Sequence, residues 1–348
     1  MLTPGSAAGD GRQFALPGVR GPWTESLMSL LTSSTSGLSI PDDMPDTPQV
    51  LSDDDLQMAL YLCYELHYAG LEGVDDRMEW DPRVVSFRGV LEQEFEAALR
   101  ELIPAAPPQR SSVGEELQRL VQQDSGPPLS RYVETRATLC EALEHVVHRS
   151  AYQLKEADPH SWAIPRLTGG PKAALVEIQA DEYGGGRAER IHAALFAETM
   201  RGLGLDCRYG AYLDLLPGVT LATVNLMSFF GLHRRLRGSI AGHLAVFEMT
   251  SSIPNRRYGN GFRRLGFGPD VTGFYDEHVE ADAVHESIAA WDLAQSLARR
   301  EPELADDILF GARALLALEA RWAEHLLESW SHGKTSLTAP LQSTVAVR

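Results

Sequence analysis

Side chains that can bind a metal recur at helical spacing in the segment EHVEADAVH. His278, Asp282 and His285 stand at positions i, i+4 and i+7, so on an α-helix they share one narrow stripe. Two imidazoles and a carboxylate suit a first-row metal of intermediate softness. A core-facing stripe would carry Leu or Ile instead, and a bland polar face is the alternative. The spacing therefore predicts metal ligands on this helix.

A second candidate pair, Glu182 and His192, lies in the segment ADEYGGGRAERIH, ten residues apart. On one ideal helix the two would be about 80° apart in azimuth, so the helical match is looser. The glycine run 184–186 is a poor helix interior, since each Gly costs about 1 kcal/mol relative to Ala. Either a kink or a close approach to bare backbone offsets this cost, or the run is a loop between two helices.

A third candidate is Glu248, in the segment HLAVFEMTSS. Its neighbours in the sequence are mostly apolar, so its helix is expected to be buried on most sides. An isolated buried carboxylate is very costly and needs a charged partner. A metal would supply that charge, and a buried arginine, Arg234 or Arg235, is the alternative.

Together the candidates form a set of three imidazoles and three carboxylates. Two divalent cations carry more positive charge than these carboxylates neutralise, and hydroxide, peroxide or a substrate carboxylate would balance the remainder. Nitrogen and oxygen ligands without thiolate favour iron or manganese, with zinc as an alternative. The six residues are Glu182, His192, Glu248, His278, Asp282 and His285.

A competing pattern is the Glu-x-x-His element of ferritin-like di-iron bundles, which Glu189 and His192 match. Such bundles need a second element of this kind on a partner helix. Of the eleven histidines, only His192 has a glutamate three residues upstream. The ferritin-like interpretation therefore lacks half its ligands.

The elements that would position these residues are helices. Residues 1–48 predict a disordered tail, 254–269 a glycine-rich loop, and 333–348 a polar, disordered tail. No segment shows the alternation of a strand, so the sequence predicts an all-α fold. Helical periodicity indicates helices at about 51–71, 84–102, 113–123, 129–155, 208–216, 218–231, 236–251 and 302–330, on both sides of the glycine run, and around the histidine stripe.

Composition limits the partners. The formal net charge of −17 over 348 residues disfavours nucleic acid and anionic lipid surfaces. No run of 18 apolar residues predicts a membrane span, and the N-terminus lacks a signal-peptide pattern. Three well-separated cysteines predict neither a disulfide framework nor a cysteine–zinc site, which favours a cytoplasmic protein.

The order and spacing of the six candidate ligands resemble the heme-oxygenase-like di-iron oxidases and oxygenases, also called iron-containing redox enzymes. The stretches DPHSWAIPRL and DEYGGGR are also similar to actinobacterial members of this group. The resemblance covers roughly residues 50–330. It implies a helical bundle that binds two Fe(II) ions and no heme, with the six residues as ligands and dioxygen as co-substrate.

The resemblance also implies a reaction class. Members form a peroxo-diferric intermediate and use it for N-hydroxylation, desaturation or oxidative C–C cleavage of small amino-acid-like or fatty-acid-like substrates. The expected organisation is a heme-oxygenase-like di-iron domain at 156–332, with extra N-terminal helices at 49–155 that pack on or extend the bundle. Those helices either cover the bundle or form a homodimer contact. An external electron donor is a further expected partner.

Three aromatic residues close to the ligands in sequence are weak candidates for a substrate pocket: Tyr183, Phe247 and Tyr275. Each is more often a core residue than a substrate contact. Two other functions stay open. A non-catalytic helical binding or carrier protein on the same scaffold would not bring the six residues together. A helical hydrolase would need a cysteine nucleophile, for which Cys207 lacks an evident His/Asp pairing.

Overall fold

The computed structural model describes residues 13–33, 37, 39–42, 44–103 and 111–341; of residues 281–284 it describes only the helical backbone. Regular structure in these ranges is helical, apart from an isolated bridge between Phe14 and Leu71. The all-α class is therefore confirmed. The α-helices are α1 (Pro22–Thr32), α2 (Thr47–Val50), α3 (Asp54–Glu65), α4 (Pro82–Leu102), α5 (Val113–Gln123), α6 (Leu129–Thr135), α7 (Leu139–Gln153), α8 (Asp158–Ser161), α9 (Gly169–Glu182), α10 (His192–Gly202), α11 (Gly218–Leu232), α12 (Arg237–Arg264), α13 (Pro269–Ser287), α14 (Ser296–Arg300) and α15 (Ala305–Ser331).

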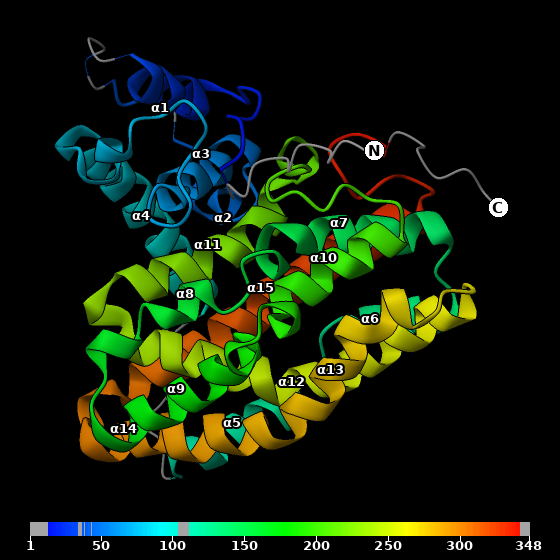
Figure 1. Ribbon diagram of the computed structural model, residues 1–348. Helices are drawn as coiled ribbons and strands as arrows, with labels where there is room; N and C mark the ends of the chain where they lie inside the picture. Colours follow the sequence, from blue (N-terminus) through cyan, green and yellow to red (C-terminus); the bar gives the residue numbers. More distant parts are fainter. Residues whose placement is uncertain (1–12, 34–36, 38, 43, 104–110, 342–348) are drawn as a thin grey trace, which may run out of the picture.

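The long helices form a bundle in which α12 is central. It packs against α15, α13 and α6, while α9 and α10 pack on the helical stretch that includes α13 (Figure 1). Helices α1 to α4 lie together at one side of this bundle, and α3 packs on α11. None of the described helices has the length and apolarity required to cross a bilayer.

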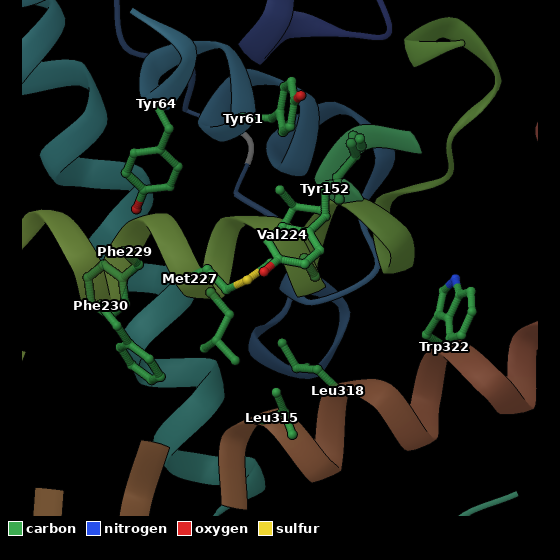
Figure 2. Packing of buried hydrophobic residues seen from close by; sticks show 14 of the residues in the cluster. Tyr61, Tyr64, Tyr152, Val224, Met227, Phe229, Phe230, Leu315, Leu318 and Trp322 are labelled. Carbon is green, nitrogen blue, oxygen red and sulfur yellow. The ribbon is translucent and has the colours of Figure 1, made fainter. Parts of the chain in front are cut away.

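One hydrophobic core joins the N-terminal helices to the bundle. Figure 2 shows Tyr61 and Tyr64 of α3 above Met227 of α11, with Leu315 and Trp322 of α15 on the other side. All five side chains are buried. Because apolar burial is the main favourable term in folding, α3 is bound to the bundle by a shared interior.

Helix α12 corrects the sequence prediction of a glycine-rich loop at 254–269. The helix continues through Pro254 and ends at Arg264. Its last turns bury Phe262 and bring Gly261 so close to α6 that an added Cβ would lie 2.7 Å from the carbonyl oxygen of Val133. The glycine thus permits helix–helix contact, and tertiary packing outweighs the low helix propensity of this segment.

Two other expected helices also differ. The segment 129–155 is divided into α6 and α7, because Thr138 and Glu141 form a capping box that starts a new helix. Most of the segment 208–216 lies in turns, and only Leu213–Leu215 forms a short 3-10 helix.

The ends of the described chain are more ordered than the sequence indicates. Within the expected tail at 1–48, α1 buries Leu27, and Asp55 accepts hydrogen bonds from the backbone of Trp23 and Thr24 at the start of α1. Near the other end, Ser336 donates from its backbone and its hydroxyl to buried Glu144. Both contacts are tertiary, so local periodicity did not reveal them.

Candidate metal centre

A tight turn places Glu182 and His192 side by side. Helix α9 ends at Glu182, and α10 begins at His192. All three residues of the glycine run have positive φ, which L side chains rarely adopt, so the loop alternative holds. At Gly184 an added Cβ would lie 2.6 Å from the carbonyl carbon of Arg190. The run therefore folds the chain back sharply, and His192 Nδ1 comes 2.8 Å from Glu182 Oε2.

Helices α12 and α13 bring Glu248 and His285 to the same place. His285 Nδ1 lies 3.4 Å from Glu248 Oε2 and 3.8 Å from Glu182 Oε1. The other ring nitrogen, Nε2, lies 3.0 Å from Asp181 Oδ2 and donates to it. This hydrogen bond fixes the tautomer that leaves Nδ1 as the ligand atom.

A third contact in the cluster joins His278 of α13 to Glu156, in the turn after α7. His278 Nδ1 donates to the carbonyl oxygen of Phe274 at 2.8 Å, so Nε2 is the ligand atom. That nitrogen lies 3.5 Å from Glu156 Oε1. Glu156 is followed by Ala157, whose φ of 75° makes it the one non-glycine residue with positive φ among those described. The strained turn between α7 and α8 is thus at the site itself.

These side chains form two overlapping groups of ligand atoms, each with all its atoms within 4.8 Å of one another. All the members are buried. Glu182 is the one residue that belongs to both groups. The first group is Glu156, Glu182, His192 and His278, and the second is Glu182, Glu248 and His285.

Three ligand atoms have no hydrogen-bond partner despite burial: Glu156 Oε2, His192 Nδ1 and His285 Nδ1. His192 Nδ1 is close to Glu182, but the contact lacks hydrogen-bond geometry. Unsatisfied buried polar atoms are costly and rare in native proteins. They converge from α10, α13 and the turn after α7, which fits a site that cations complete, with nitrogen and oxygen ligands suited to iron.

Electrostatics in the cluster follow from this geometry. Burial lowers the pKa of His285, but the carboxylates of Glu248, Asp181 and Glu182 outweigh it and raise that pKa to about 9. Burial raises the pKa of Glu182, but the neighbouring histidines, His192 first, bring it below its usual value. In the absence of cations, therefore, the proton on His285 offsets part of the negative charge of the neighbouring carboxylates.

The cavity at the cluster is small, with a volume of about 10 Å³. Glu156, Glu182, Glu248 and His278 line it, together with apolar residues that include Phe247. A space of this size has room for about one group the size of a water molecule, and not for a larger substrate.

The structure brings together five of the six residues expected from the sequence, and the side chain of Asp282 lies outside the described residues. Sequence reasoning missed Glu156. Its signal was the spacing of Tyr152, Glu156 and His160 at i, i+4 and i+8, although a turn at Ala157 interrupts that pattern.

The competing interpretations find no support in the geometry. Glu189 of the ferritin-like pattern is exposed, and Arg235 pairs with Glu96 at the surface instead of with Glu248. Cys207 accepts a hydrogen bond from Arg201 on the outside of the molecule. The buried cluster of histidines and glutamates thus remains the candidate functional site.

The three aromatic residues that were weak candidates for a substrate pocket lie in three different places. Phe247 lies at the small cavity and makes an edge contact with Tyr152. Tyr183 lines a different, larger cavity. Tyr275 is buried and stacks on Phe262, in the core.

Comparison with known proteins agrees with this geometry. Nitrosourea synthase from Streptomyces achromogenes subsp. streptozoticus is 26% identical over 137 residues, which cover 39% of this chain and 29% of that protein. The match thus spans less than a third of the relative's length. A family model described as iron-containing redox enzyme matches residues 143–320, just over half of the chain. The resemblance seen in the sequence is confirmed, and the chain belongs to the iron-containing redox enzyme family.

Proposed function

We propose that this protein is a non-heme di-iron, O₂-dependent oxidase or oxygenase of a small amino-acid-like or fatty-acid-like substrate. The observation that carries the proposal is the position of Glu182, shared by two groups of buried ligand atoms. One group would hold the first Fe(II) and the other the second. Two ferrous ions bound there would supply the electrons that activate dioxygen.

The chain's own residues have separate tasks in this proposal. Asp181 and the carbonyl of Phe274 orient His285 and His278, each by accepting a hydrogen bond from the ring nitrogen that faces away from the cluster. Such outer hydrogen bonds preserve ligand geometry. Phe247 and Leu244 line the cavity and exclude water from it. Asp282, on the same helix as both histidines, is proposed as a further ligand from its spacing alone.

The reaction is proposed at the level of its class: N-hydroxylation, desaturation or oxidative C–C cleavage. The name of the relative, nitrosourea synthase, describes a product with oxidised nitrogen and so favours the first. An external electron donor would return the irons to the ferrous state where the substrate does not supply all the electrons.

The experiment is an anaerobic titration of metal-free protein with Fe(II), followed by metal analysis and by oxygen uptake on exposure to air. We expect two irons per chain and oxygen consumption that depends on iron. Glu182→Ala should lose both irons, whereas the matched control Glu189→Gln, at an exposed carboxylate, should bind two. Iron at trace level in the wild type would refute the proposal. Full iron binding with no oxygen uptake under any substrate would favour a carrier.

A further inference from the structure

Two small cavities lie on either side of one partition inside the bundle. The first is the cavity at the ligand cluster, here called the metal cavity, which Glu182 and His160 line. The second, here called the outer cavity, also has a volume of about 10 Å³, and His243 lines it. Tyr152 and Phe247 line both cavities, so they form the partition between them. Each cavity has room for about one water molecule.

A hydrogen bond between two buried imidazoles crosses this partition. His160 Nε2, from α8, lies 3.1 Å from His243 Nδ1, from α12. Of these two rings, only His160 lines the metal cavity and only His243 lines the outer cavity. Both histidines are buried. The pair is therefore a polar connection between two spaces that aromatic side chains otherwise separate.

The shared hydrogen bond limits where protons can lie on the two rings. It holds a single proton, so one ring donates and the other accepts through a bare nitrogen. Burial, and to a smaller extent the ring of His160, lowers the pKa of His243 well below its usual value, so His243 is uncharged near neutral pH. The remaining nitrogens, His160 Nδ1 and His243 Nε2, form no hydrogen bond with any residue that the structure describes. Each is therefore available to exchange a proton with a molecule in a cavity.

The outer cavity extends toward the surface. Arg149 and Glu319 line it and form a two-point ion pair, with N–O distances of 2.9 and 2.6 Å. The side chain of Glu319 is 28% exposed, so a carboxylate in contact with solvent lies at the same cavity as His243. A water molecule in this cavity would therefore have an imidazole and a carboxylate as polar neighbours.

Packing alone does not account for the pair. His243 stacks on Phe247 with an interplanar angle of 19°, a place that an apolar ring would also fill. Two polar rings buried together incur a desolvation cost that apolar rings would not. Transfer of a proton, in contrast, requires a ring nitrogen at each cavity and a hydrogen bond between the rings. Both requirements are met here.

We propose that His160 and His243 form a proton relay from the surface to the metal cavity. This rests on the proposed function, because reduction of dioxygen consumes protons. In one transfer, His160 Nδ1 gives its proton to an oxygen atom in the metal cavity, while Nε2 takes up the shared proton from His243 Nδ1. His243 Nε2 takes up a proton that enters from solvent through the outer cavity. Each ring gains one proton and loses one, no electrons move, and rotation of the rings restores the starting tautomers.

The first test needs no iron: NMR of the metal-free protein with isotope-labelled histidine, in which saturation transfer measures exchange of the His160 ring proton with water. His243→Phe keeps a ring against Phe247 but removes the nitrogen that passes the proton, so it should slow this exchange about tenfold or more. His243→Asn can keep a hydrogen bond to His160 but cannot carry a proton, so it should slow exchange equally. The matched control His145→Phe changes a buried histidine that lines neither cavity and should leave the exchange unchanged.

The second test uses iron-loaded protein and measures a single turnover of oxygen uptake. Both His243 variants should bind as much iron as the wild type, because His243 lies outside the two ligand groups. Their oxygen uptake should be slower, and their solvent deuterium isotope effect larger, because proton delivery then limits the rate. The control His145→Phe should match the wild type in both measurements. Circular dichroism confirms that each variant is folded.

The outcomes separate the relay from the function on which it rests. Exchange at the wild-type rate in both His243 variants would overturn the relay, whatever the iron titration shows. Wild-type exchange in His243→Asn alone would also overturn it, since the hydrogen bond and not proton transfer would then matter. Slow exchange with an unchanged oxygen uptake and isotope effect would overturn delivery of protons to the metal cavity. A wild-type protein that binds no iron would refute the di-iron function, while the exchange measurement would still decide whether the pair passes protons.

Discussion

Glu182 Oε2 lies 2.8 Å from His192 Nδ1, although ten residues and a helix boundary separate the two in the chain. The contact depends on a reversal of the backbone through three glycines with positive φ, a conformation that L side chains rarely adopt. It also places the carboxylate common to both ligand groups against the first residue of α10. The glycine run is therefore part of the metal centre in a structural sense.

Two glycine substitutions in this turn test that dependence. Gly184→Ala combines positive φ with a clash against the backbone at Arg190, so it should displace His192 and reduce iron affinity by at least tenfold. Gly185→Ala is the matched control, since its φ is also positive but its Cβ would meet open space. It should cost only about 1–2 kcal/mol of stability. Equal iron affinities in the two variants, measured by competition with a chelator, would contradict this account.

Glu156 should behave as a ligand although sequence reasoning overlooked it. Glu156→Ala removes one carboxylate from the group that holds His278 and should reduce iron from two ions per chain to about one. The remaining group, with Glu248 and His285, should stay occupied. Metal analysis after gel filtration measures this directly. Two tightly held irons in the variant would exclude Glu156 from the centre.

Asp181 should act through the orientation of His285. Its carboxylate accepts a hydrogen bond from Nε2–H, so Asp181→Ala leaves the imidazole free to change tautomer or rotate. Loss of such a partner typically weakens metal affinity by about 10- to 100-fold. Asp181→Asn, which retains an acceptor, should recover most of the affinity. A binding curve for Asp181→Ala that overlaps the wild-type curve would show that packing alone orients the ring.

Breaking the buried ion pair between Lys155 and Glu65 should strongly reduce the stability of the fold. Lys155→Met leaves the carboxylate of Glu65 buried without a cation and should destabilise the fold by about 3–5 kcal/mol. The double variant Lys155→Met/Glu65→Gln should recover most of that loss, because no charge is then left unpaired. Urea unfolding of the three proteins gives the comparison. A double variant no more stable than the single one would argue against this explanation.

His145 predicts a dependence of stability on pH. Burial, and to a smaller extent the charge of Arg149, lowers its pKa to about 3. The unfolded chain, with a histidine pKa of about 6.5, binds the proton more readily between these values. Stability from the neutral ring is thus complete above pH 6.5 and falls below it, by up to about 1.4 kcal/mol per pH unit.

His145→Phe tests this dependence, because it keeps a ring against Tyr258 but removes the titrating group. The variant should lose less stability than the wild type between pH 6.5 and pH 4.5, as measured by urea unfolding at each pH. If the two curves run parallel across this range, His145 does not contribute to the acid sensitivity.

The residue types of most candidate metal ligands could be inferred from the sequence alone. His278 and His285 lie seven residues apart on a helix, and helical geometry alone puts them on one face. Glu248 lies among apolar neighbours in the sequence and is buried in the structure. Because burying an isolated carboxylate is costly, the sequence indicated that Glu248 has a charged partner. These inferences rest on local periodicity and on the cost of burying charge, which are properties of short segments.

Contacts between distant segments required the tertiary structure. Glu156 was overlooked because it lies in the turn between α7 and α8, where the positive φ of Ala157 breaks the helical spacing. Pro254 was expected in a loop, yet close packing of Gly261 on α6 keeps the helix intact.

The sequence by itself determined the helical class and most of the residue types of the buried cluster, because both follow from residue chemistry and a period of 3.6. Only the tertiary structure decided that Glu182 belongs to both ligand groups, and that Tyr68 from the N-terminal helices reaches a cavity beside them. Such convergence depends on how helices pack and where turns reverse the chain, and no local pattern encodes it.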